Sequence, residues 1–363
     1  MNIKTLLRVQ FVIVSFLILG SCSVTDSVVA SVVWVGCNRR GNDWEKSDLT
    51  DPSGANVAQL TQTVTDLNNL QFPAEIKPFF FLAGDLVPGM KTPEDLTNQL
   101  NAWATLYRSL KLSSNYNFVP LPGNHEMLTE YNGNEILLPG ADAAWLSWLH
   151  ANQFDTYAGN GPTTAAPNLD SLVDDQSKLS YSFDSGSVHY VVLNTDTLVS
   201  NTSQIGWIPL NWLKQDLASA QNNSAIRTIL VFGHKPLLPA KPPVGQSNSG
   251  TDLTLDSSLV APLAQLLDST TKVKAYLCAH VHSWDAQQLP GTRGVWQIIS
   301  GFGGSPLTFN GNPASGAYFG FTLLNIYQSG KVSFTEYRRP APNPYTATPT
   351  VPAVAQPEQI VSY

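Results

Sequence analysis

Charged side chains are scarce in this chain of 363 residues. Asp, Glu, Lys and Arg make up 13% of it, against about 25% in typical soluble domains. The formal net charge of -7 is mild and gives no basic footprint for a nucleic acid backbone and no polybasic membrane patch. We therefore expect no nucleic acid partner. Uncharged polar residues supply the polarity instead, a composition often found in exported proteins.

Apolar runs long enough to span a bilayer are also lacking. The stretch from Phe11 to Leu19 follows Lys4 and Arg8 and is short, so residues 1–21 are expected to be an export signal. Small residues precede Cys22 as in the lipobox of bacterial lipoproteins. This pattern predicts an exported bacterial protein, facing the periplasm or the surface and anchored to the membrane by a lipid on Cys22, with residues 22–30 as a linker. An ordinary signal peptide cut nearby is the alternative.

Cysteine is nearly absent from the rest of the chain, where only Cys37 and Cys278 remain. In an oxidising compartment two cysteines can pair. The sequence alone leaves a disulfide, metal ligation and core packing open for both.

Alternating apolar runs and helical periods predict a layered α/β fold with partly parallel sheets. Strands are expected at 32–35, 79–82, 118–121, 179–183, 188–193, 226–232, 273–278, 295–300, 318–326 and 331–337, and helices at 51–70, 93–112 and 207–218. Residues 132–178 show a helical period only at 143–150 and are interpreted as a long insertion. One domain over residues 31–338 is expected, followed by a tail over 339–363 whose Pro, Ala and Thr content predicts an extended or disordered segment.

Four of the six histidines stand in short polar clusters that directly follow apolar runs. The clusters are Gly84-Asp85, Gly123-Asn124-His125-Glu126, Gly233-His234 and Ala279-His280-Val281-His282. They place carboxylate, amide and imidazole groups at strand ends. Imidazole favours transition metals and oxygen donors admit Mn or Fe, so the set predicts a site for divalent or trivalent metal.

In this order the clusters resemble the calcineurin-like metallophosphoesterase family, whose strand-end motifs are D-x-H, G-D, G-N-H-D/E, G-H and G-H-x-H. The resemblance covers roughly residues 33–303. It implies a four-layer αββα sandwich and hydrolysis of a small-molecule phosphate ester by metal-activated hydroxide, with one or two metal ions of the Fe, Mn or Zn type.

The resemblance also assigns roles to residues. One metal would be held by Asp85, Asn124, His234 and His280. His282 would bind a second metal beside Asp85, and His125 would protonate the leaving group as general acid. Asp196 is expected at the surface or in a turn.

The first motif departs from the family. Cys37-Asn38-Arg39 stands where the family has D-x-H, which puts Cys37 at the aspartate position and Arg39 at the histidine position. A thiolate can replace a carboxylate as a metal ligand, and D-type alkaline phosphatases resemble this chain locally in having a cysteine after their first strand. Arg39 or Arg40 would instead present a guanidinium to the phosphate. A degenerate metal-binding or scaffold protein on the same fold is therefore the alternative to an enzyme.

Overall fold

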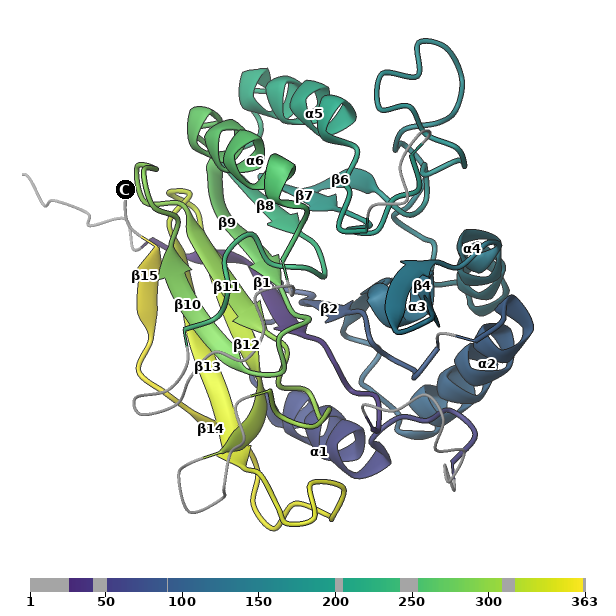
Figure 1. The fold of residues 1–363 in the computed structure, drawn as a ribbon. Coiled ribbons are helices and arrows are strands. Elements are labelled where there is room, and N and C mark those ends of the chain that lie inside the picture. Colours follow the sequence, from purple (N-terminus) through teal and green to yellow (C-terminus); the bar gives the residue numbers. More distant parts are fainter. Residues whose placement is uncertain are drawn as a thin grey trace, which may run out of the picture.

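The apolar runs form two β-sheets that pack face to face (Figure 1). The computed structural model describes residues 26–41, 51–89, 91–199, 205–241, 254–308 and 317–361. Residues 1–21 and Cys22 lie outside these ranges, so the export signal and the lipid anchor stay predictions. No helix within the described ranges has the length and apolar character needed to cross a membrane.

The first sheet has the strand order β14-β13-β12-β1-β2-β3, and β15 also pairs with β13. Its strands are β1 (Val28–Val35), β2 (Phe79–Ala83), β3 (Asn117–Leu121), β12 (Tyr318–Tyr327), β13 (Val332–Pro340), β14 (Val354–Ala355) and β15 (Gln359–Val361). The strands β1, β2 and β3 run parallel to one another. All five residues of β2 are buried, as expected for a parallel strand covered on both faces.

The second sheet has the order β10-β11-β9-β8-β7-β6. Its strands are β6 (Tyr181–Ser185), β7 (Val188–Val192), β8 (Thr228–Phe232), β9 (Val273–Cys278), β10 (Trp284–Gln288) and β11 (Trp296–Ser300). The central strands β7, β8, β9 and β11 are parallel, and the edge strands β6 and β10 are antiparallel to their neighbours. Because the two sets of parallel strands end near the same edge of the sandwich, residues that follow them can meet.

Aromatic side chains fill the space between the sheets. The rings of Phe81 on β2 and Phe232 on β8 stack with centroids 4.0 Å apart, and Trp34 on β1 lies 5.2 Å from Phe232. Such pairs add stability beyond the area they bury. This inner layer holds the two sheets, and therefore the two sets of strand ends, at a fixed separation.

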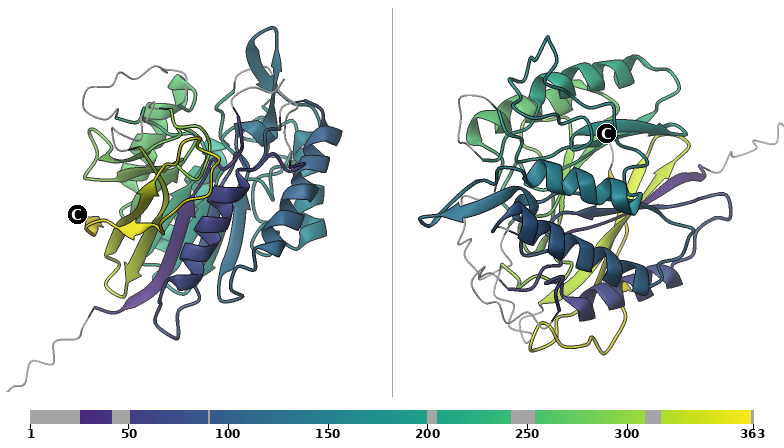
Figure 2. Two further views of the ribbon diagram at one scale, coloured as in Figure 1. Left: turned by 90° about the horizontal axis from the view of Figure 1, so that it is seen from below. Right: turned by 90° about the vertical axis from the view of Figure 1, so that its right-hand side faces the viewer.

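Helices cover both outer faces (Figure 2). The helices α1 (Val57–Asn69), α2 (Pro93–Ser109) and α4 (Ala141–Asn152) pack on the first sheet, and α5 (Leu210–Asn222) and α6 (Ser257–Ser269) pack on the second. Local signals start two of them: the Asn56 side chain accepts from Gln59 N, and Thr92 accepts from Asp95 N just before Pro93. The αββα sandwich is confirmed.

The chain after β3 contains a helical turn and a hairpin that were not predicted, and of these elements only β5 lies in the insertion expected at 132–178. A single turn of helix, α3 (Asn124–Met127), leads into a hairpin of β4 (Leu128–Tyr131) and β5 (Asn134–Leu137). Helix α4 then packs on α2, at the right of Figure 1, whereas α5 and α6 lie at the top. The hairpin follows the Gly123-Asn124 cluster closely in sequence.

The tail contains extended and paired segments, the first of the two alternatives expected for it. Its strands β14 and β15 both pair with β13, and Arg339 at the start of the tail is fully buried. The Tyr345 hydroxyl accepts from Gly41 N at 2.9 Å. The tail is therefore tied to the first sheet and to the segment that follows β1.

Both remaining cysteines are buried and free. Cys278 ends β9 and is buried in the apolar core between the second sheet and its helices. Of the three alternatives for Cys278, this is core packing. Cys37 lies beside the polar clusters described next.

Candidate metal centre

The predicted clusters meet at one end of the sandwich, because each follows a parallel strand. Asp85 follows β2 and Asn124 follows β3 in the first sheet; His234 follows β8, and His280 and His282 follow β9, in the second. All of them are buried, with at most 9% of each residue exposed. Residues from distant parts of the sequence are thus assembled into one polar site in the interior.

Four of these side chains place one atom each around a common point. The Nε2 atom of His234 lies 3.2 Å from Asp85 Oδ1, 3.1 Å from Asn124 Oδ1 and 3.1 Å from His280 Nδ1. The Nδ1 atom of His280 is 3.0 Å from Asn124 Oδ1. Bonds from a metal to N or O are about 2.0–2.2 Å, so donors around one ion stand roughly 3 Å apart. The four atoms fit one metal ion.

Hydrogen bonds and charges around these four side chains fix their orientation and charge. The Nδ1 atom of His234 lies 2.5 Å from the Ala83 carbonyl, which fixes the tautomer with Nδ1–H donating and leaves the Nε2 lone pair facing Asp85. Burial works against a charged His234, but the Asp85 carboxylate outweighs it and raises the His234 pKa. In the same way, burial alone would raise the pKa of Asp85, whereas His125 and His234 hold it well below its usual range. The Asp85 side chain is therefore an ionised carboxylate at neutral pH.

The backbone is strained where it delivers these groups. Cys37, Asp85 and His280 have φ angles of 59°, 54° and 62°, a region that residues other than glycine seldom adopt. Such conformations persist where the surrounding structure enforces them, often at functional sites. Glycine is needed beside them: a Cβ on Gly84 would stand 2.3 Å from Gly123 N.

Glu126 holds the turn that carries Asp85, a role that its place in the motif did not reveal. Its carboxylate accepts from Asp85 N, Leu86 N and Val87 N at 2.8–3.2 Å and from Gly123 N at 2.8 Å. Burial and the nearby Asp85 charge raise the Glu126 pKa to about 7. Glu126 thus ties the end of β2 to the end of β3.

Glu135 was also missed, because it lies in the insertion outside every motif. It stands on β5, and its Oε1 accepts from Asn124 Nδ2 at 3.1 Å. This hydrogen bond points the Asn124 carbonyl oxygen at the metal position. Groups that orient a ligand in this way commonly contribute to metal affinity.

We predict that Glu135→Ala weakens metal binding about 10–100-fold, the usual effect of removing a ligand's orienting partner. Glu135→Gln should retain most of the affinity, because its amide oxygen can still accept from Asn124. Titration of metal into the apoprotein measures both. Glu130→Ala is the matched control, since Glu130 is the exposed partner of Glu135 across the hairpin. Equal affinities of Glu135→Ala and wild type would contradict the role.

The other oxygen of Asp85 has different neighbours. Asp85 Oδ2 lies 3.3 Å from Arg39 Nε and 3.9 Å from both His282 Nε2 and His125 Nε2.

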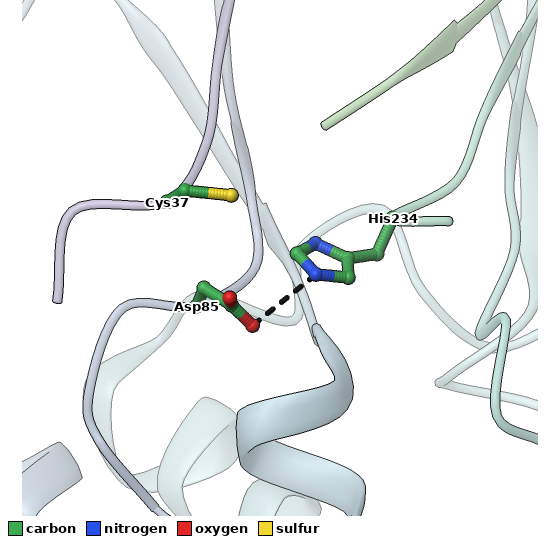
Figure 3. Close-up of side chains that lie close together, drawn as sticks. All are labelled: Cys37, Asp85 and His234. Atoms are coloured by element: carbon green, nitrogen blue, oxygen red, sulfur yellow. Dashed lines mark ion pairs between the residues drawn. The ribbon is translucent and has the colours of Figure 1, made fainter. Parts of the chain in front are cut away.

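The sulfur of Cys37, one Asp85 oxygen and one His234 nitrogen all lie within 4.8 Å of one another (Figure 3). Burial, followed by the Asp85 charge, raises the Cys37 pKa well above its ordinary value. Without a bound cation, Cys37 is therefore a neutral thiol.

His125 lies on the Oδ2 side of Asp85, and its imidazole is not one of the four donors around the common point. Its Nδ1 atom is 2.7 Å from the Pro88 carbonyl, so Nδ1–H donates there and Nε2 faces Asp85 Oδ2. Burial, and then the Arg39 charge, lowers the His125 pKa to about 3. The His125 imidazole is therefore neutral at pH 7.

Asp196 lies in a turn, one of the two places expected for it, but this turn is not at the surface. It is buried, and its Oδ1 accepts from Lys235 Nζ at 2.6 Å and from Gly206 N at 2.8 Å. Lys235 directly follows His234 and is itself 1% exposed. A buried ion pair therefore anchors the turn that carries His234.

Comparison with solved structures gives the same fold. A dimetal phosphatase from Danio rerio matches with a TM-score of 0.54 and 11% identity, over 91% of this chain and 99% of the other. PhoD matches with a TM-score of 0.51 and 12% identity, over 93% of this chain and 72% of the other. At such identities the likeness establishes the fold alone. No curated protein sequence matches the chain.

The amino-acid sequence itself matches a protein family. The family described as calcineurin-like phosphoesterase matches residues 47–284. The match begins after Cys37-Asn38-Arg39, the motif that departs from the expected pattern. Because it covers more than half of the chain, the protein belongs to the calcineurin-like phosphoesterase family.

Proposed function

We propose that this protein is a metal-dependent phosphohydrolase that cleaves a small-molecule phosphate ester with His125 as the general acid. The observation that carries the proposal is the convergence of Asp85, Asn124, His234 and His280 on one point. A metal held there supplies Lewis acidity and lowers the pKa of water. Family membership supports the same reaction class.

The chain's own residues provide the rest of the chemistry. His125 Nε2 faces the same Asp85 oxygen as His282 Nε2, which places the imidazole next to the position of a phosphoryl group. The negative charge of a bound phosphate ester favours the protonated imidazole. His125 can then donate the Nε2 proton to the leaving oxygen, while Nδ1–H stays bonded to Pro88.

The competing proposal is a metal-binding or scaffold protein without turnover. It is favoured by one observation, the replacement of D-x-H by Cys37-Asn38-Arg39. The position of His125 supports the enzyme instead, because its imidazole is held by the Pro88 carbonyl and directs Nε2 into the site, where it can donate a proton.

The deciding experiment combines metal analysis with hydrolysis of a phosphomonoester and a phosphodiester, using p-nitrophenyl phosphate and bis(p-nitrophenyl) phosphate. We expect metal-dependent hydrolysis of at least one ester by the protein loaded with Mn, Fe or Zn, abolished by a chelator. Asn124→Ala should lower metal affinity at least about tenfold, since it removes a ligand, and hydrolysis should fall with it. Asn115→Ala, at an exposed position, is the control. Bound metal without hydrolysis of either ester would favour the scaffold.

A further inference from the structure

Arg39 occupies the side of Asp85 that a second metal ion would need. Asp85 Oδ1 points at the first group of donors, whereas Oδ2 faces Arg39 Nε at 3.3 Å. His282 Nε2 lies 3.9 Å from the same Oδ2. The positive charge of the Arg39 guanidinium therefore already lies next to this oxygen.

The guanidinium is fixed in this position. Arg39 N donates to the Asp85 carbonyl at 3.1 Å, Arg39 pairs with Ala55 in an antiparallel bridge, and Nη1 donates to the Gly41 carbonyl. Its side chain is only 8% exposed. Arg39 is part of the wall of the site and not a mobile surface arginine.

The donors on this side do not suit a second transition metal. Such ions usually take at least three protein ligands at about 2.0–2.3 Å. Here Asp85 Oδ2 is already paired with Arg39, and the family's histidine ligand is replaced by Arg39 itself. This leaves His282 Nε2 and the Cys37 sulfur, short of three free donors. A second dication would also be repelled by a guanidinium that a salt bridge holds beside it in a buried, weakly screened site.

We propose that the centre binds a single metal ion and that Arg39 takes the place of the second, presenting its guanidinium to the phosphoryl oxygens of the substrate. This proposal rests on the proposed function for its substrate. A guanidinium carries five N–H donors in a planar fork, more than the contacts to Asp85 and Gly41 use, and this fork matches two phosphate oxygens. Fixed positive charge then stabilises the phosphoryl group without a second metal site.

The test counts metal ions. Purified protein is saturated with Mn(II), freed of excess metal, and analysed by mass spectrometry of the metal and by electron paramagnetic resonance. We expect one ion per chain and the spectrum of an isolated Mn(II) ion. The double variant Cys37→Asp/Arg39→His restores D-x-H and should bind two ions with a magnetically coupled spectrum. Arg40→His, which adds a histidine at the next position, should still bind one.

A second measurement tests the proposal without the double variant, in case that variant does not fold. Binding of inorganic phosphate to the metal-loaded protein should weaken about 10–100-fold in Arg39→Gln, the range for losing a charge-assisted hydrogen bond. It should stay unchanged in Arg227→Gln, because Arg227 is exposed and directly precedes β8, at the strand end opposite to His234. Two coupled ions in wild type, a folded double variant that binds one ion, or unchanged phosphate binding in Arg39→Gln would each overturn the proposal. One ion per chain without ester hydrolysis would overturn the proposed function and still support the single-metal centre.

Discussion

Replacing Arg339 by methionine is expected to destabilise the protein by about 3–5 kcal/mol, the usual cost of breaking a buried ion pair by removing one partner. Arg339 is fully buried, and its Nη1 lies 3.2 Å from Asp66 Oδ2. It also donates to Gln59 Oε1, the Gln59 carbonyl and Thr63 Oγ1 at 2.9–3.0 Å. The substitution leaves the Asp66 carboxylate buried without its counter-charge.

Urea unfolding followed by circular dichroism measures this loss. Arg338→Met is the matched control, because Arg338 is the exposed neighbour on the same strand, and surface substitutions usually stay within about 0.5 kcal/mol. A shift of less than about 1 kcal/mol for Arg339→Met would show that the pair contributes no more than a surface salt bridge.

The effect of Arg339 should extend to the metal centre through α1. Arg339 bonds to residues on α1, and Asn56 at the start of that helix donates its backbone N–H to the Asn38 carbonyl at 2.7 Å. Asn38 in turn donates from its side chain to the Gly303 carbonyl. The tail therefore supports the segment that carries Cys37 and Arg39, although Arg339 and Arg39 are 300 positions apart in sequence.

Much of the sandwich could be predicted because its central strands are continuous apolar runs. The strand predicted at 273–278 coincides with β9, and the one predicted at 79–82 falls one residue short of β2. Helix α6 was not predicted; it contains Pro262 in its interior, a residue that normally argues against a helix. Composition left open whether the tail is extended or disordered, because it describes local preference, whereas the order of the tail comes from distant partners such as Asp66.

The candidate ligands were found for a related reason: residues that directly follow parallel strands lie at the same edge of the sheet and therefore close together. Glu126 and Glu135 were not recognised, since one serves backbone N–H groups and the other comes from an unpatterned insertion. The contact between Arg39 and Asp85 also lay beyond the sequence, because it depends on how the turn after β1 crosses the turn after β2. Motifs located the side chains, and only the fold showed which cation faces which oxygen.

Replacing His125 by alanine is expected to lower kcat about 100–10,000-fold, the range for loss of a general acid, while the metal content stays unchanged. His125 contributes no atom to the group of four donors, and its imidazole contacts the Pro88 carbonyl and faces Asp85 Oδ2 at 3.9 Å. Its removal should therefore spare the metal and remove the proton donor.

The leaving group distinguishes this role from a structural one. An alkyl phosphate releases a strongly basic alkoxide and needs protonation, whereas p-nitrophenolate leaves readily without it. The loss in His125→Ala should consequently be large with an alkyl phosphate and much smaller with p-nitrophenyl phosphate. His150→Ala, at a histidine whose side chain is 81% exposed, should match wild type with both esters. An equal loss with both esters, or a loss of bound metal, would assign His125 to support of the site, because only a proton donor makes the rate depend on the basicity of the leaving oxygen.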